Sequence, residues 1–112
     1  MSSYRQLKVW QFSFEVVKDV YSITSLLPDI EKFGLTSQSQ RSAVSVPSNI
    51  AEGQQRNGSK EFKHFISIAR GSAAELSTQL LLIQDVNEID CEKTILKVEE
   101  IQKMLYSLSS KL

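Results

Sequence analysis

The sequence has few of the residues that form turns, disulfides and most catalytic centres. Its 112 residues include four glycines, two prolines, one cysteine and one histidine. So few glycines and prolines argue against an all-β fold, which needs many tight turns. A lone cysteine, Cys91, cannot form an intrachain disulfide, and this favours a reducing compartment, the cytoplasm. With His64 as the single histidine, a two-histidine metal site is incomplete within one chain.

The sequence also lacks a net charge and a long hydrophobic run. Its 13 basic and 13 acidic side chains cancel, so the monomer has no overall charge to attract nucleic acid or a membrane surface. Residues 1–70 nevertheless hold nine basic and six acidic residues, whereas residues 71–112 hold four and seven. Solvated faces explain this difference most simply, and head-to-tail complementarity or a local basic surface is the alternative. The longest strongly apolar run, residues 80–83, is far below the roughly 20 residues of a membrane span, so we expect no membrane partner.

Apolar residues recur at spacings of three and four along four segments, which is the pattern of an amphipathic helix. The segments are residues 8–27, 36–52, 59–83 and 90–112. Short links between long helices favour antiparallel neighbours. We therefore predict an all-α protein, an antiparallel up-down four-helix bundle in which residues 1–112 form a single domain.

Several residues are typical of helix ends or interruptions. Pro47 lies inside the second segment, where it removes a backbone hydrogen bond and predicts a kink. Gly53 follows that segment at a position suited to a left-handed C-terminal residue. Residues whose side chains accept hydrogen bonds from free amides are expected to cap the starts of the later helices: Thr36 or Ser37, Ser59 and Asp90.

The first helical segment carries two apolar stripes rather than one. They consist of Trp10, Phe14, Val17 and Tyr21, and of Phe12, Val16, Val20, Ile23 and Leu27. A helix in a bundle buries one such stripe against the core. The second stripe, that of Phe12 and Val16, needs a separate cover, because a contiguous exposed apolar patch marks an interaction site. The sequence therefore predicts self-association.

The second helical segment has a wholly polar seam beside its small apolar residues. Its members are Gln38, Ser42, Ser45, Asn49, Glu52 and Arg56. One interpretation is a side that faces solvent. The other is a hydrogen-bonded network with the third segment, which would fix the helix register rather than perform chemistry. That structural polar network would comprise Arg41, Ser45, Asn49, Glu52, Arg70, Ser72 and Glu75.

A basic cluster surrounds the link between the second and third segments. It consists of Arg56, Ser59, Lys60, Lys63 and His64. The free amides at a helix N-terminus would add to an anion site, so the cluster is a candidate for binding RNA or DNA. A solubilising loop is the simpler alternative. The lysines beside His64 repel a metal cation, and the sequence holds no glycine-rich phosphate-binding motif. We expect no metal, no cofactor and no catalytic residue.

Several motifs resemble those of a known protein family. They are Leu35-Thr36-Ser37-Gln38, Arg41, the run SVPSNIAEG at residues 45–53, and Phe62, Phe65, Gly71-Ser72 and Glu75-Leu76. With Val9-Trp10 near the start, they cover about residues 5–88. These motifs are similar to those of the four-helix-bundle proteins encoded in 23S rRNA intervening sequences. The run SVPSNIAEG is quite specific, because a proline beside a polar seam is rare inside a helix.

The resemblance implies a bacterial, cytoplasmic four-helix bundle that assembles as a ring-shaped homopentamer and has no catalytic residues. A related group, the accessory proteins of diversity-generating retroelements, uses a similar pentameric barrel to bind nucleic acid and a reverse transcriptase. Two functional hypotheses follow. The first is a non-enzymatic oligomeric protein that acts as an assembly or interaction scaffold. The alternative is an RNA- or DNA-binding accessory protein whose basic cluster is repeated around a ring.

Overall fold

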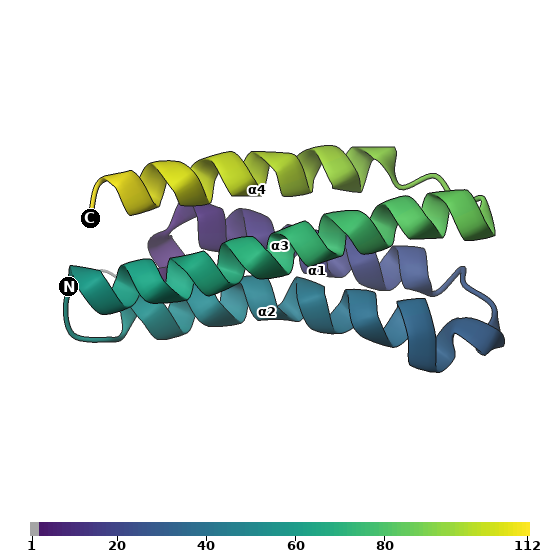
Figure 1. The fold of residues 1–112 in the computed structure, drawn as a ribbon, viewed down its shortest axis with the longest axis horizontal. Helices are drawn as coiled ribbons and strands as arrows, with labels where there is room; N and C mark the ends of the chain where they lie inside the picture. Colours follow the sequence, from purple (N-terminus) through teal and green to yellow (C-terminus); the bar gives the residue numbers. More distant parts are fainter. Residues whose placement is uncertain (1–2) are drawn as a thin grey trace.

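A computed structural model describes residues 3–112, and Figure 1 shows four long helices lying side by side. α1 spans Lys8–Thr24, α2 Ser37–Gln54, α3 Ser59–Asn87 and α4 Glu92–Ser110. Each helix runs opposite to the next along the chain, and α1 also packs against α4, which closes the bundle. The fold is therefore the expected antiparallel up-down four-helix bundle, a rod of 43 × 22 × 19 Å.

Three short helical turns complete the described chain. η1 (Tyr4–Gln6) precedes α1, whereas η2 (Asp29–Glu31) and η3 (Lys32–Thr36) join α1 to α2. The α1–α2 and α3–α4 links lie at one end of the rod, and the α2–α3 link and the end of α4 lie at the other (Figure 1). Within residues 3–112, no helix is both long enough and apolar enough to cross a membrane.

The core is a cluster of mostly aliphatic side chains from all four helices. α3 contributes the row that its spacing predicts, including Ala69, Ala73, Leu76, Leu80 and Ile83, all at most 1% exposed. The other rows are Val9, Val16 and Val20 in α1, Ala43, Val46 and Ile50 in α2, and Ile95, Val98, Ile101 and Leu105 in α4. Fully burying a side chain the size of leucine contributes about 1.5–3 kcal/mol. The burial of these four rows confirms the prediction that each helix turns one apolar face into the core.

α1 ends at Thr24, before the expected residue 27. Two hydroxyls at this end donate to backbone carbonyls, Thr24 Oγ1 to Tyr21 O at 3.2 Å and Ser25 Oγ to Ser22 O at 2.6 Å. Such bonds offer the backbone an alternative to the helical ladder. The next two amides bond three residues back, as in a tight turn. Pro28 then disfavours helical dihedral angles for the residue before it.

The predicted caps of α2 and α3 are wrong. Thr36 has helical dihedral angles and makes no capping bond, because η3 runs directly into α2 at Ser37. Within η3 the non-helical residue is Gly34, with φ −107° and ψ −113°. At the start of α3 the N-cap is Gly58, with φ +95°, so Ser59 is the first helical residue. Glycine adopts a positive φ without a steric penalty, which suits it to this tight entry.

Asp90, the predicted N-cap of α4, lies one residue before the actual N-cap, but its side chain still bonds the start of the helix. The N-cap is Cys91, and the helix begins at Glu92. The Asp90 carboxylate accepts the Glu92 amide at 3.0 Å, and Gln84 Oε1 accepts the Cys91 amide at 2.9 Å. Side chains therefore satisfy two amides that have no partner inside the helix.

Gly53 is not a left-handed helix end. It lies inside α2, which continues to Gln54, and Gly58 is the only glycine with a positive φ among residues 3–112. Gly53 is buried, and a Cβ built on it would lie 2.6 Å from Cβ of Phe65 in α3. Glycine stands here because the two helices approach closely. α2 also runs as one helix through the buried Pro47.

Candidate assembly and binding surfaces

α1 turns one apolar stripe into the bundle and leaves part of the other at the surface. Val16 and Val20 of the second stripe are 2% and 0% exposed. Phe14 and Tyr21 of the first stripe are each 49% exposed. One stripe therefore packs in the bundle while part of the other stays at the surface. The prediction that the second stripe is the one that needs a cover is wrong, because helix packing turns Val16 and Val20 inward.

The uncovered stripe continues across the junction of α1 and α2. Trp10 packs against Phe14 with their ring centroids 5.1 Å apart. Further along α1, Tyr21 lines a hollow of about 640 Å³ together with Phe33 and Val44. Phe33 is 88% exposed and Val44 is 41% exposed. We call this surface the apolar face, and its members are Trp10, Phe14, Val17, Tyr21, Phe33 and Val44. Trp10 and Val17 are half-buried and also pack against the core, whereas the other four are exposed.

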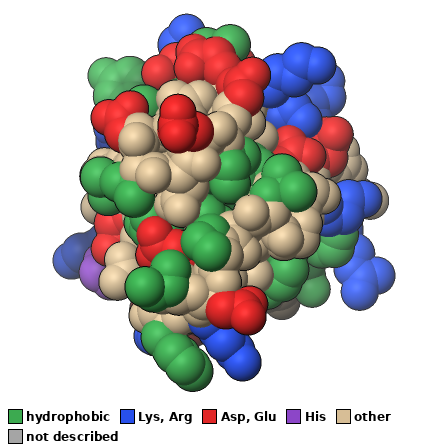
Figure 2. Space-filling view, turned by 90° about the vertical axis from the view of Figure 1, so that its right-hand side faces the viewer, with side chains coloured by type: hydrophobic (Ala, Val, Ile, Leu, Met, Phe, Trp, Pro, Cys, Tyr) green, Lys and Arg blue, Asp and Glu red, His purple; other side chains and the backbone are tan. Residues whose placement is uncertain are grey.

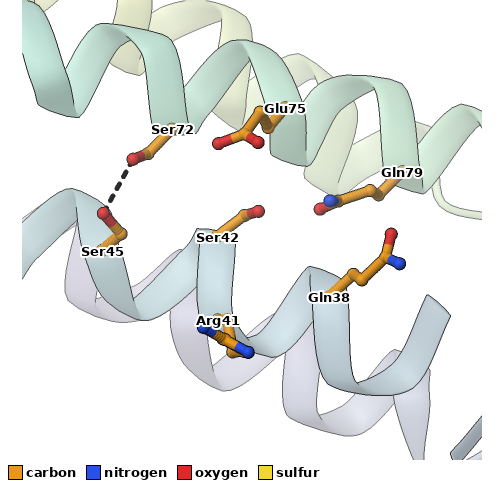
Figure 3. A pocket seen from close by; sticks show the side chains of 7 residues that line it. All are labelled: Gln38, Arg41, Ser42, Ser45, Ser72, Glu75 and Gln79. Atoms are coloured by element: carbon orange, nitrogen blue, oxygen red, sulfur yellow. Dashed lines mark hydrogen bonds between the residues drawn. The ribbon is translucent and has the colours of Figure 1, made fainter. Parts of the chain in front are cut away.

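A polar groove runs between α2 and α3 (Figure 3). Seven side chains line its hollow of about 380 Å³: Gln38, Arg41, Ser42, Ser45, Ser72, Glu75 and Gln79. The hydroxyl oxygens of Ser45 and Ser72 lie 2.7 Å apart and form a hydrogen bond between the helices. Asn49 Nδ2 donates to the carbonyl and hydroxyl oxygens of Ser45, at 2.8 and 2.9 Å. The Ser45–Ser72 bond joins α2 to α3, whereas the Asn49 bonds lie within α2 and position the Ser45 side chain.

Only part of the expected polar network forms. Arg41 and Glu75 line the groove, but among residues 3–112 no hydrogen bond or ion pair joins either of them to another side chain. Glu52 and Arg70 lie outside the groove: Glu52 pairs with Arg56, which lies just beyond the end of α2, and Arg70 covers a tyrosine ring of α4. A seam with a period of 3.5 residues drifts by about 20° per heptad, which turns its far end toward solvent.

Arg70 cannot join the polar network of the groove because of its position on α3. Two residues correspond to a turn of about 200° in an α-helix, so Arg70 and Ser72 point to opposite sides of α3. Gln79 takes part in the groove although the sequence reasoning missed it. It lies seven residues after Ser72, and this heptad spacing was an available signal. Its Oε1 atom is buried and has no hydrogen-bond partner within the described chain.

Four members of the basic cluster surround one hollow at the α2–α3 link. The hollow measures about 730 Å³ and is lined by Arg56, Lys60, Glu61, Lys63, His64 and Phe65. Ser59, the first residue of α3, is not among them. The Arg56 guanidinium lies 5.0 Å from the Phe65 ring centroid, and its hydrogen bond with Glu52 raises the pKa of Arg56. Two carboxylates, those of Glu52 and Glu61, therefore reduce the local positive charge.

A comparison with protein families reaches beyond the residues that carried the resemblance. The model of the family described as 23S rRNA-intervening sequence protein matches residues 5–107. The chain belongs to this family. The match includes most of α4, whereas the motifs recognised in the sequence cover only residues 5–88. A search of curated proteins found no match.

In this 23S rRNA-intervening sequence protein, the run SVPSNIAEG forms much of the second half of α2. Val46 and Ile50 of this run are buried in the core. Ser45 and Asn49 face the polar side and make the bonds described above. Gly53 lies at a close approach to α3. The motif that carried the resemblance therefore serves both the core and the α2–α3 contact.

The cysteine and the histidine of the intervening-sequence protein lie at opposite ends of the rod. Cys91 stands at the α3–α4 link, and His64 lies in the first turns of α3. Burial, with a smaller effect of the Asp90 carboxylate, raises the pKa of the Cys91 thiol. The thiol therefore stays protonated at neutral pH, and the two groups cannot pair within one chain.

Proposed function

We propose that this protein is a non-enzymatic scaffold that works as a homo-oligomer, with copies docked through the apolar face. The observation that carries the proposal is the half exposure of Phe14 and Tyr21, next to Trp10, on a helix whose other side is already packed. The family resemblance supports a ring of five copies. The scaffold would present the remaining helix surfaces to other molecules.

The composition of the apolar face suits a contact between proteins. Fully burying an aromatic side chain contributes about 1.5–3 kcal/mol, and Trp and Tyr are enriched among the residues that dominate binding energy. A standard interface takes about 800 Å² from each partner. The chain exposes 6834 Å², so each interface of a ring would use only a small part of that surface.

The polar groove supports this role by fixing α2 relative to α3. The Ser45–Ser72 hydrogen bond crosses between the helices, and Val44 of the apolar face is the residue next to Ser45. A rotation or slip of α2 would therefore displace part of the apolar face. Hydrogen-bonded networks of this kind specify one arrangement more than they add stability.

We assign the scaffold no catalytic role. Nucleophilic catalysis needs a nucleophile and a base within hydrogen-bond reach, about 2.6–3.2 Å. The one thiol and the one imidazole of the chain stand at opposite ends of the rod, and the pKa of the thiol is raised rather than lowered. Neither group is therefore placed to act on a substrate with the other.

Light scattering coupled to size-exclusion chromatography tests the assembly. At micromolar concentration the wild-type protein should elute as a particle of about five times 12.7 kDa for a pentameric ring. Phe14→Glu places a charge on the apolar face and should yield monomers, because burying an unpaired carboxylate is strongly unfavourable. A wild-type particle of 12.7 kDa would overturn the proposal.

Ser22→Glu is the matched control for this experiment. It adds the same charge to an exposed position of α1 outside the apolar face, so the oligomer should persist. Circular dichroism of both variants checks that the bundle remains folded. Equal dissociation of the two variants would show that charge on α1, rather than loss of the apolar contact, breaks the assembly.

Binding of RNA or DNA is the second candidate function. The observation that favours it is the convergence of Arg56, Lys60, Lys63 and His64 on one hollow. Five copies in a ring would multiply a weak contact. Affinity for structured RNA should fall steeply with added salt, because phosphate contacts release counterions. Lys60→Glu with Lys63→Glu should abolish it, and wild-type protein that retains no RNA at low salt would exclude this function.

A further inference from the structure

Carboxylates gather at the end of the rod where α1 meets η2 and α3 meets α4. They are Asp29, Glu31, Asp85, Glu88, Asp90 and Glu92, and the cations on the same segments are Lys32 and Lys93. Figure 2 views the molecule from this side and shows acidic and apolar side chains over much of the surface, with most basic ones at the periphery. We call this surface the acidic end.

Exposed apolar side chains lie on the same segments as the carboxylates. Ile30 is 89% exposed, Leu26 68% and Val86 64%. Asn87 Nδ2 donates to Glu31 Oε2 at 3.2 Å, and this bond attaches the loop that carries Ile30 to the end of α3. An apolar centre with a charged surround is the usual anatomy of a protein–protein interface.

The opposite end of the rod carries the complementary features. There, Arg56, Lys60, Lys63 and His64, together with the carboxylate of Glu61, line the hollow of about 730 Å³ whose apolar wall is Phe65. Arg56 is paired with Glu52, so Lys60 and Lys63 supply most of the positive charge. This size is within the range of about 300–1,000 Å³ that accommodates a small organic molecule. We call this surface the basic end. The hollow has room for a protruding side chain such as Ile30.

We propose that the acidic end of one copy docks on the basic end of a second copy, with Ile30 seated beside Phe65. The occupant is a second copy because the chain itself supplies both the acidic apolar projection and the basic hollow. The contact joins two different surfaces, so it propagates along the rod axis instead of closing as a symmetric dimer. It is separate from lateral docking through the apolar face.

Charge complementarity makes this contact dependent on salt. Complementary charges steer association and set the docking orientation, and screening weakens them. The screening length falls from about 30 Å at 0.01 M to about 3 Å at 1 M salt. Sedimentation velocity of the full chain should therefore show larger particles at low salt that return to a smaller particle at high salt. The lateral apolar contact persists at both.

Charge reversal at either end tests the two surfaces separately. Asp29→Lys with Asp85→Lys, or Lys60→Glu with Lys63→Glu, should each abolish the larger particles. An equimolar mixture of the two double variants should restore them, because each acidic surface then meets a basic one. Ile30→Ser should also reduce the larger particles, since it removes the side chain that enters the hollow.

Glu99→Lys with Glu100→Lys is the control, because it makes the same charge change at exposed positions in the middle of α4. This variant should keep the salt-dependent particles. Phe14→Glu should lose the lateral assembly yet keep the end-to-end contact, so the two contacts fail separately. If the wild-type particle has the same mass at low and at high salt, a second copy does not bind the acidic end and the proposal is overturned. Reversed variants that fail to recover on mixing would also overturn it.

Discussion

Replacing Gly53 with alanine perturbs a close contact between α2 and α3. The added methyl group would lie 2.6 Å from Phe65 Cβ and 3.1 Å from Phe62 Cδ1. Real Cβ atoms essentially never approach another heavy atom as closely as the first of these distances. Phe65 Cβ is attached to the α3 backbone, so a change of side-chain rotamer cannot relieve the contact. The helices must move apart, which also disturbs the packing around them.

Two opposing terms determine the size of this effect. Alanine has a higher helix propensity than glycine, which favours the variant by about 0.5–1 kcal/mol. Inserting a methyl group into a well-packed contact costs about 1–3 kcal/mol. The free energy of unfolding of Gly53→Ala should therefore fall by up to about 2.5 kcal/mol. For a domain of this size, that corresponds to a decrease in Tm of up to about 10 °C.

Gly71→Ala is the matched control for the unfolding experiment. Gly71 also lies within a helix, but a Cβ there would have no atom within 4 Å. This variant should therefore be stabilised by about 0.5–1 kcal/mol. Urea unfolding followed by circular dichroism, at one fixed protein concentration, measures both changes. If both glycine variants gain stability equally, the close approach of α2 and α3 at Gly53 is refuted.

Three further predictions concern the other contacts of the bundle. Ser72→Ala should lower the free energy of unfolding by about 1 kcal/mol. In a double-mutant cycle, the stability losses of Ser72→Ala and Ser45→Ala should not add fully, because both variants break the same hydrogen bond. Lys97 Nζ donates to Asp19 Oδ2 at 2.8 Å, and this bond raises the pKa of Lys97. Because the folded pKa lies above the unfolded value of about 10.4, the stabilisation is complete below that value and is lost as pH rises through the folded pKa. Lys97→Met should remove this loss of stability at high pH. The loss is at most about 0.5 kcal/mol, because both side chains of the pair are about one-third exposed. Finally, Cys91 should react with a thiol reagent at pH 7 far more slowly in the folded protein than in urea, and equal rates would contradict its burial.

The helices and their order were predictable because the spacing of apolar residues is a local property of the chain. The seam of α3 from Ala69 to Ile83 is buried as its spacing of three and four residues predicts. The family was also predictable from short motifs, above all SVPSNIAEG, and the family match over residues 5–107 confirms it. Neither inference needed to know which helix packs against which.

The ends of the helices and the polar network were predicted less well. Gly53 and Gly58 are both glycines near a helix end, yet only Gly58 has a positive φ, whereas Gly53 avoids a clash with α3. A sequence pattern does not distinguish these two reasons for glycine. Glu52 was placed in the network because it follows the polar seam, but the structure pairs it with Arg56 at the surface.

By itself the sequence determined that four amphipathic helices form and that α1 carries more apolar surface than one core can cover. Only the tertiary structure decided that Val16 faces inward and that Phe14 remains exposed. It also brought the carboxylates of the η2 segment and of the α3–α4 link to one end of the rod. The rotation of a helix about its axis, and the residues that meet at its end, depend on neighbouring helices that are distant in the sequence.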